Sequence, residues 1–141
     1  MSTSVTVVDA AGAPHGMTAN SFTSVSLDPP LILVCIDRGT AFLNHFAPAS
    51  RFAINVLQES QNELSSTFAR SGVDRFAGVD WSPGGNGAPI LPGVLATFEC
   101  QVSQMVQAGD HVVVIAEAHH ATWREGRPLI YFNSGYQALQ S

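Results

Sequence analysis

Met17-Thr-Ala-Asn-Ser-Phe-Thr-Ser-Val-Ser-Leu-Asp-Pro-Pro30 leads directly into Leu31-Ile-Leu-Val-Cys-Ile36, and the rest of the chain is best understood from this junction. The first part contains no Lys, Arg or Glu, but carries six uncharged side chains that can both donate and accept hydrogen bonds. The second part is a continuous apolar run, the pattern of a strand buried on both faces. A polar segment is therefore anchored to a core strand.

The polar segment has two interpretations on its residues alone. Its composition by itself favours a strand rich in Ser and Thr at the edge of a sheet. Its small residues Ala19, Ser21 and Ser24 would also let a flat ligand approach the backbone closely, and the absence of charge suits a polar but uncharged heterocycle.

Short strands and two short helices are expected along the rest of the chain. Thr40 can cap a helix that runs to about residue 46, and Ser60-Gln-Asn-Glu63 has the form of a capping box. The helix that it opens should present Leu64 and Phe68 on one face and cover the barrel. Strands are expected at 5–9, 31–36, 51–57, 94–106, 111–118 and 129–132, with a hairpin turn at 11–14.

Three further features complete the expected architecture. The strand at 94–106 alternates apolar residues with Glu99, Gln101 and Ser103, which predicts one solvent-facing side. The residues from 71 to 92 are rich in Gly, Pro, Asp and Asn, which predicts a long loop of the kind that often acts as a lid or binding element. The last strand should close the sheet. Mostly antiparallel strands with two short helices favour a small barrel.

The composition indicates one intracellular domain over residues 1–141. The net charge is 6 − 11 = −5, and charged residues make up only 12% of the chain, which disfavours an electrostatic nucleic-acid binder and suggests self-association. Cys35 and Cys100 lie in strand patterns, as buried thiols do. There is no membrane-span pattern and no cationic start of a signal peptide, so a soluble, cytoplasmic protein is expected.

Several catalytic classes lack their motifs. The chain has neither a Gly-x-Gly-x-x-Gly nor a Gly-x-x-x-x-Gly-Lys loop, and no Gly-x-Ser-x-Gly elbow. His119 and His120 would point to opposite faces of a strand, so a surface cluster is favoured over a shared metal ion. No metal site and no catalytic side chain is predicted.

The chain resembles the short-chain flavin reductase family in blocks that follow the family's order and span nearly its whole length. This resemblance implies a mainly β fold, the FMN-binding split barrel, an antiparallel Greek-key-like barrel with short covering helices. The blocks are residues 16–31, Val34-Cys-Ile36, Asp74-Arg-Phe-Ala-Gly-Val-Asp-Trp81, Ala88-Pro-Ile-Leu91, Gly109-Asp-His111 and Pro128-Leu-Ile-Tyr131.

The resemblance also implies which residues bind the cofactors. Two groups should contact the flavin ring, and a third should hold the ribityl chain and phosphate, where a hydroxyl at a helix start receives the anion. The ring groups are Thr18, Ala19, Asn20 and Ser21, with Ser24, Val25 and Ser26 beside them; the phosphate group is Cys35, Ile36, Asp37, Arg38 and Thr40. For Thr40, a plain helix N-cap is an equal alternative, compatible with phosphate binding.

Other candidate residues lie further along the chain. The His of the family's Gly-Asp-His turn, here His111, helps to position the reduced nicotinamide cofactor; without the family, this residue would be a strand-edge histidine after a hairpin turn. Arg75, Phe76, Tyr131 and Tyr136 are further candidates for contacts to flavin or nicotinamide, and barrel packing is the alternative for both tyrosines.

By this resemblance, the chain is an NAD(P)H-dependent flavin oxidoreductase. It would transfer hydride from NADH or NADPH to FMN or FAD, form a homodimer and supply reduced flavin to a partner monooxygenase. Such chemistry belongs to the two cofactors, so the protein needs only to stack them. The alternative is a non-catalytic FMN-binding or interaction protein of the same fold. It stays open because Phe42 stands where the family commonly has a second hydroxyl residue, and because only four residues precede the strand that begins at Val5, where the family usually has a helix.

Overall fold

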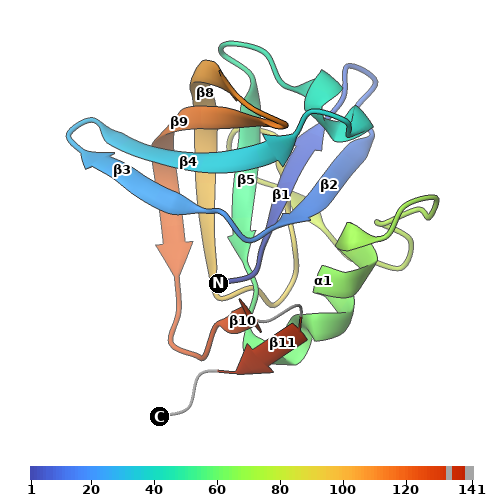
Figure 1. Ribbon diagram of the computed structural model, residues 1–141. Coiled ribbons are helices and arrows are strands. Elements are labelled where there is room, and N and C mark those ends of the chain that lie inside the picture. The colour runs from blue at the N-terminus through green and yellow to red at the C-terminus, as the bar shows by residue number, and fades with distance from the viewer. Residues whose placement is uncertain (133–134, 139–141) are drawn as a thin grey trace.

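The computed structural model describes residues 1–132 and 135–138, with side chains as far as Leu129. Seven antiparallel strands form one sheet in the order β2-β1-β5-β8-β9-β4-β3 (Figure 1). The strands are β1 (Thr3–Val8), β2 (Pro14–Ala19), β3 (Thr23–Leu27), β4 (Pro30–Asp37), β5 (Arg51–Val56), β8 (Ala96–Ala108) and β9 (His111–Trp123). The mainly β, antiparallel barrel predicted from the sequence is confirmed.

The sheet is curled because its two edge strands are neighbours in the sequence. Strands β2 and β3 lie at opposite ends of the strand order, yet only residues 20–22 separate them. So short a connection brings the two edges together, as Figure 1 shows at the front of the barrel. The polar segment thus supplies the end of one edge strand and the whole of the other, which confirms the edge-strand interpretation.

Short helices cover the ends of the barrel. Thr40 caps the 3₁₀ helix η1 (Ala41–His45), as expected. The helix α1 (Asn62–Ala69) follows the single 3₁₀ turn η2 (Glu59–Gln61), and its Leu64 and Phe68 pack into the cluster beneath it. The predicted capping box at Ser60–Glu63 is wrong, because the reciprocal cap is two residues earlier, between Gln58 and Gln61.

Two apolar clusters hold the elements together. The larger one fills the barrel with side chains from all the long strands, including the fully buried Val34, Ile54 and Val114. The smaller one consists of Leu57, Phe68, Leu91 and Leu129, with Leu64 and other half-buried apolar residues packed around it. It fastens α1 and the following loop to the barrel, and therefore fixes one wall of the pocket described below.

Three expectations for individual strands are corrected. Glu99 is only 7% exposed, because register shifts at 99/100 and 102/104 interrupt the alternation of β8. Strand β4 is fully buried on one face only; Leu33 and Cys35 on the other face are half-buried. The strand β10 (Leu129–Phe132) does not close the sheet, but pairs with β11 (Gly135–Ala138) as a separate hairpin.

The predicted loop at 71–92 contains only the two-residue strands β6 (Ser82–Pro83) and β7 (Pro89–Ile90). Both cysteines are free thiols, and burial raises the pKa of Cys100 to about 12, with a further contribution from Glu99. Within the described residues, no helix has the length and apolar character that crossing a bilayer requires.

Candidate functional site

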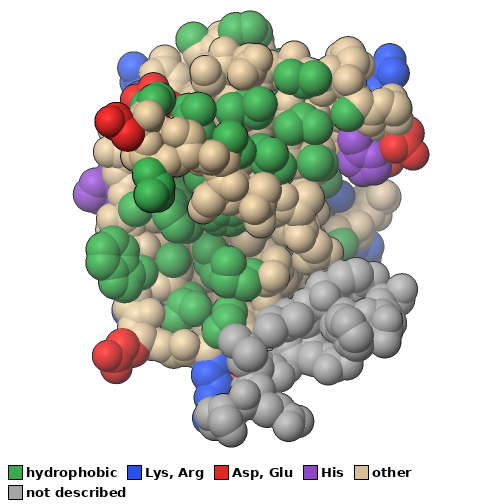
Figure 2. Space-filling model, turned by 60° about the vertical axis from the view of Figure 1, so that its left-hand side comes forward, with side chains coloured by type: hydrophobic (Ala, Val, Ile, Leu, Met, Phe, Trp, Pro, Cys, Tyr) green, Lys and Arg blue, Asp and Glu red, His purple; other side chains and the backbone are tan. Residues whose placement is uncertain are grey.

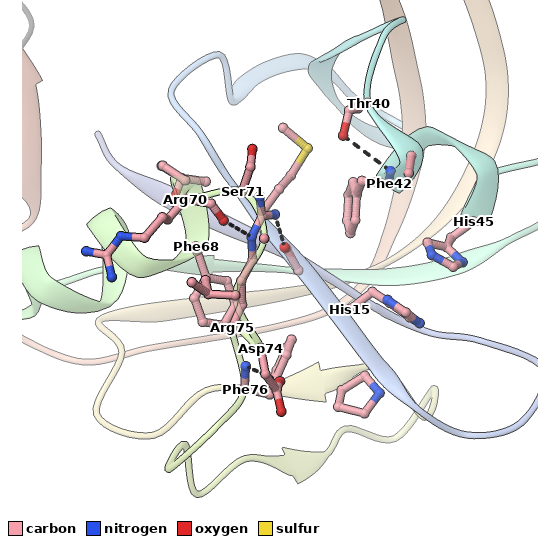
Figure 3. Close-up of a pocket in the computed structure, with 18 of the residues that line it drawn as sticks. His15, Thr40, Phe42, His45, Phe68, Arg70, Ser71, Asp74, Arg75 and Phe76 are labelled. Atoms are coloured by element: carbon pink, nitrogen blue, oxygen red, sulfur yellow. Dashed lines mark hydrogen bonds between the residues drawn. The ribbon is translucent and has the colours of Figure 1, made fainter.

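A pocket of about 990 Å³ lies against strand β2, and three distant segments of the chain line it (Figure 3). Strand β2 contributes Pro14 to Thr18. The other walls are the segment from the end of β4 into η1 and the segment from the end of α1 to residue 76. Because the sheet curls, the predicted ring-binding and phosphate-binding segments meet at one place. Five of the predicted residues line this pocket: Thr18, Asp37, Thr40, Arg75 and Phe76.

Two hydroxyl groups of the pocket already have structural partners. The Thr18 hydroxyl donates to the Ser65 carbonyl of α1 at 2.5 Å, which ties β2 to the helix. The Thr40 Oγ1 accepts a hydrogen bond from the Phe42 N–H at 3.3 Å. As an acceptor in this cap, Thr40 keeps its own O–H free to donate, so the N-cap role is confirmed and a ligand contact remains compatible with it.

Arg75 brings a positive charge into the pocket. Its Nη1 donates to the Gly16 carbonyl at 2.6 Å, and its Nε donates to the Arg70 carbonyl at 3.1 Å. Burial lowers the pKa of this half-buried guanidinium. No carboxylate lies within ion-pair distance of Arg75 among the described residues, so the charge is held in place by neutral carbonyl groups and is available to an anion.

Aromatic rings form the floor of the pocket beside Arg75. Phe68 and Phe76 are in edge-to-face contact, with ring centroids 4.9 Å apart. Phe68 lies so close to β2 that a Cβ atom on Gly16 would be 2.5 Å from its ring. Glycine at position 16 is therefore required by this close approach of ring and strand. Phe42, the departure from the family pattern, is 6% exposed and packs on Phe46 while lining the pocket.

Sequence reasoning missed two histidines in the pocket wall. His15 of β2 and His45 of η1 both line it, and their rings are stacked with centroids 4.0 Å apart. Asp9, in the turn after β1, is 2.8 Å from His15 through its Oδ2 and the ring Nε2. Thirty residues separate the two histidines in the sequence, so no local pattern indicates that they meet.

The Gly-Asp-His turn lies next to the pocket rather than in it. His111 is the register partner of Asp37, which lines the pocket. Arg38 points away to this turn, since its backbone N–H donates to the Asp110 carbonyl at 3.0 Å and its Nη1 to the Gly109 carbonyl at 3.1 Å. The His111 Nδ1 is 2.8 Å from Asp110 Oδ1, and this hydrogen bond lowers the pKa of Asp110.

The remaining predicted ring-binding residues lie around the junction of the two sheet edges. The side chain of Ala19 is buried in the core, and Asn20 is exposed just beyond β2. Ser21 accepts a hydrogen bond from the Cys35 N–H at 2.9 Å, so its hydroxyl ties the β2–β3 connection to β4. Ser24, Val25 and Ser26 belong to edge strand β3, where a register shift leaves Val25 without a partner in β4.

Of the other candidate residues, some are too buried for their side chains to reach a ligand, and others have side chains outside the described residues. Ile36 is fully buried in the core, so only its backbone could reach a ligand, and Cys35 is half-buried. Tyr131 and Tyr136 are paired across the β10–β11 hairpin, but their side chains lie outside the described residues.

The arrangement is suited to binding rather than to side-chain catalysis. A guanidinium, a helix-capping hydroxyl and aromatic rings converge on a pocket whose volume is typical of cofactor sites. Among the described residues there is no group of three potential metal ligands. His119 and His120 were expected on opposite faces of a strand; both are exposed and both line a second pocket beside β8, where a register shift in the β8–β9 pairing interrupts the alternation. A planar ligand with an anionic tail fits these groups.

Comparison with known proteins identifies related chains. Residues 1–140 match the family described as flavin reductase like domain. A probable flavin reductase of Rhizobium meliloti is 50% identical over 137 residues, which cover 97% of this chain and 41% of the relative. The reductase component of a flavin-dependent trigonelline monooxygenase of Acinetobacter baylyi is 44% identical over 137 residues, covering 95% of this chain and 44% of the relative. This chain thus spans less than half the length of both relatives.

A solved structure confirms the fold. The NADH:FAD oxidoreductase SgcE6 of Streptomyces globisporus C-1027, in complex with NAD and FAD fragments, matches with a TM-score of 0.91 and 35% identity. The match covers 99% of this chain and 84% of that structure.

Proposed function

Because this chain belongs to the flavin reductase like domain family, we propose that it is an NAD(P)H-dependent flavin oxidoreductase that reduces FMN or FAD. The observation that carries the proposal is the pocket on β2, where Arg75, Thr40 and the phenylalanine rings converge. The relatives named as flavin reductases support the same activity.

The residues of the pocket fit a flavin nucleotide. Arg75 has a charge without an acidic partner among the described residues, which suits a phosphate, and Thr40 can donate its hydroxyl proton to the same group. Phe42 and Phe76 supply apolar surface. Asn20, Ser24 and the backbone at Ala19 remain proposed ring contacts; they lie in or beside the two edge strands, next to the β2 residues that line the pocket.

In this mechanism the protein acts by positioning the flavin and the hydride donor relative to each other. A bound flavin would supply the hydride-accepting chemistry. Arg75 and Thr40 hold the anionic end, the aromatic floor limits access of water, and the strand edges orient the planar ligand, which makes the encounter with the hydride donor effectively unimolecular. His111 is the proposed contact to the nicotinamide nucleotide, since its turn adjoins the pocket at Asp37.

We also propose that the protein acts as a homodimer. Its sheet presents apolar side chains over β3, β4, β8 and β9, a face that Figure 2 shows with hydrophobic side chains spread across it. Leu27 is 93% exposed and Trp123 is 80% exposed. Apolar surface of this extent is typical of an interface, and symmetric dimers are the commonest closed assemblies.

Supply of reduced flavin to a separate monooxygenase is the proposed cellular role. The relative named as the reductase component of such an enzyme supports it. A cytoplasmic location belongs to the same proposal and is supported by the two free thiols.

Two measurements test the proposal. Oxidation of NADH or NADPH with added FMN or FAD distinguishes a reductase from a flavin-binding protein without activity, which would bind flavin but leave the nicotinamide nucleotide unchanged. Titration of flavin fluorescence tests the site: Arg75→Gln should weaken flavin binding about tenfold, and Arg75→Lys should recover part of the loss because it restores the charge. Arg51→Gln, on an exposed residue outside the pocket, is the matched control.

A further inference from the structure

The stacked histidines His15 and His45 have no role in the function proposed so far. Their rings are 4.0 Å apart between centroids and tilted by 24°, and both residues line the pocket. Figure 3 shows the pair on one side of the pocket, with Phe42 beside it and Arg70 and Arg75 on the other side. The pair is therefore a second polar site along the same pocket.

Asp9 holds the histidine pair in place, and His45 keeps its hydrogen-bonding groups available to a ligand. Asp9 accepts hydrogen bonds from the Ala11 and Ala13 N–H groups at 2.9 and 3.0 Å, and its second oxygen lies 2.8 Å from His15 Nε2. This fixes the His15 ring, on which His45 stacks. Neither ring nitrogen of His45 has a hydrogen-bond partner in the part of the chain that is described.

A bound anion would change the electrostatic balance at the pair. Burial lowers the pKa of His45, and the positive charge on His15 lowers it further, while Asp9 opposes both effects. Two stacked imidazolium rings repel each other, so a bound anion would relieve this repulsion and promote protonation. The other charged groups that line the pocket are Asp37 near η1 and Arg70, Asp74 and Arg75 on the opposite wall.

The position of the pair indicates which anion it would meet. His45 ends η1, the helix whose N-cap is the proposed phosphate contact Thr40, so the pair lines the pocket on the same segment as that contact. FMN ends at its single phosphate, whereas a dinucleotide continues through a second phosphate to adenosine.

We propose that His15 and His45 bind the ADP half of a dinucleotide through its phosphates. The proposal rests on the proposed function, and the ADP half could belong to FAD or to the nicotinamide donor. In either case binding takes up a proton, so affinity should increase as the pH falls through the range in which histidine titrates.

Equilibrium titrations of the full chain test this subsite. FAD, FMN, NADH and the ADP group, supplied as ADP-ribose because its diphosphate diester keeps its charge over this range, are each titrated at about pH 6 and about pH 8 against the wild type, His45→Gln and the control His119→Gln, which removes an exposed histidine outside the pocket. We expect ADP-ribose to bind about tenfold more tightly at the lower pH, and FMN to show a much smaller change. His45→Gln should abolish this pH dependence, and His119→Gln should keep it.

The two possible sources of ADP give different results. If FAD shares the pH dependence of ADP-ribose, the subsite serves the flavin; if NADH shares it, the subsite serves the donor. His45→Phe keeps the aromatic packing on Phe42 and must lose the pH dependence as His45→Gln does.

An ADP-ribose affinity that is the same at both pH values, or that His45→Gln and His45→Phe leave unchanged, would overturn the subsite. That result is separate from a failure of the proposed function. Flavin could still bind and be reduced without the subsite, and ADP-ribose binding remains measurable even if neither flavin binds.

Discussion

Ser21 shows how a single polar residue can extend the contact between two neighbouring segments, here the β2–β3 connection and strand β4. Its hydroxyl oxygen accepts the Cys35 N–H at 2.9 Å and lies 3.4 Å from the Cys35 carbonyl oxygen. The resemblance assigns Ser21 to the flavin ring, whereas its contacts show that it bridges the connection between the sheet edges and β4. If Ser21 has a structural role, its replacement should lower the free energy of unfolding. If it only contacts the ligand, its replacement should leave that free energy unchanged.

Ser21→Ala should lower the free energy of unfolding by about 1 kcal/mol, because the Cys35 N–H loses its acceptor. Urea unfolding followed by fluorescence measures the change, with Ser24→Ala, on the exposed edge strand, as the control. Equal stability of the two variants would show that the bond contributes nothing and would return Ser21 to a purely ligand-binding role.

His111 is the second residue whose role can be separated by mutation. Its turn is fastened to the end of β4 through Arg38 and lies outside the pocket, beside Asp37. His111→Ala should therefore raise the KM for NADH with a smaller change in kcat, while flavin affinity stays nearly constant. A large loss of flavin affinity at an unchanged KM would instead make His111 part of the flavin site.

At the scale of elements, the β1–β2 hairpin depends on the ionised carboxylate of Asp9. The hydrogen bond from His15 and those from the Ala13 and Ala11 N–H groups lower the pKa of Asp9. A carboxyl group whose pKa is depressed by folding stabilises the protein above its unfolded-state pKa, and this contribution is lost as the pH falls through the folded-state value.

Asp9→Asn should therefore be less stable than the wild type at about pH 6, and this difference should shrink as the pH falls below about 4. Thermal unfolding of both proteins across this range measures it. A stability difference that is constant over the whole range would mean that the charge of Asp9 does not contribute, and that only its side-chain shape matters.

Sequence patterns predicted elements better than they predicted contacts between elements. The strand at 31–36 and the Thr40 cap are local features, and both were confirmed, although burial of that strand on both faces was not. Glu99 was placed wrongly, because the bulges in β8 depend on pairing with β9, and alternation alone does not reveal them. The stacking of His15 on His45 likewise follows from the curled sheet, and nothing in either local sequence predicts it.

At the scale of the whole molecule, curling of the sheet creates both the pocket and an apolar outer face. The pocket arises where β2 meets the segments after β4 and α1. The outer face exposes Leu27 and Trp123, which is costly in water unless another surface covers them.

Sedimentation should therefore show a dimer at micromolar concentration. Leu27→Lys with Trp123→Lys should shift the protein to the monomer, because buried lysines are expensive to desolvate. Ala77→Lys, on an exposed residue outside both the pocket lining and the apolar face, is the control. A wild-type monomer, with flavin present, would contradict the proposed assembly.

We propose above all that this chain catalyses hydride transfer from a nicotinamide nucleotide to flavin. The most direct measurement is anaerobic mixing of NADH or NADPH with FMN or FAD and a catalytic amount of the protein, followed through the flavin absorbance near about 450 nm. We predict rapid loss of this absorbance in step with oxidation of the nicotinamide nucleotide, at a rate proportional to protein concentration, and a slower reaction with Arg75→Gln at subsaturating flavin. Flavin that stays oxidised with both donors, although the folded protein binds it, would contradict the claim.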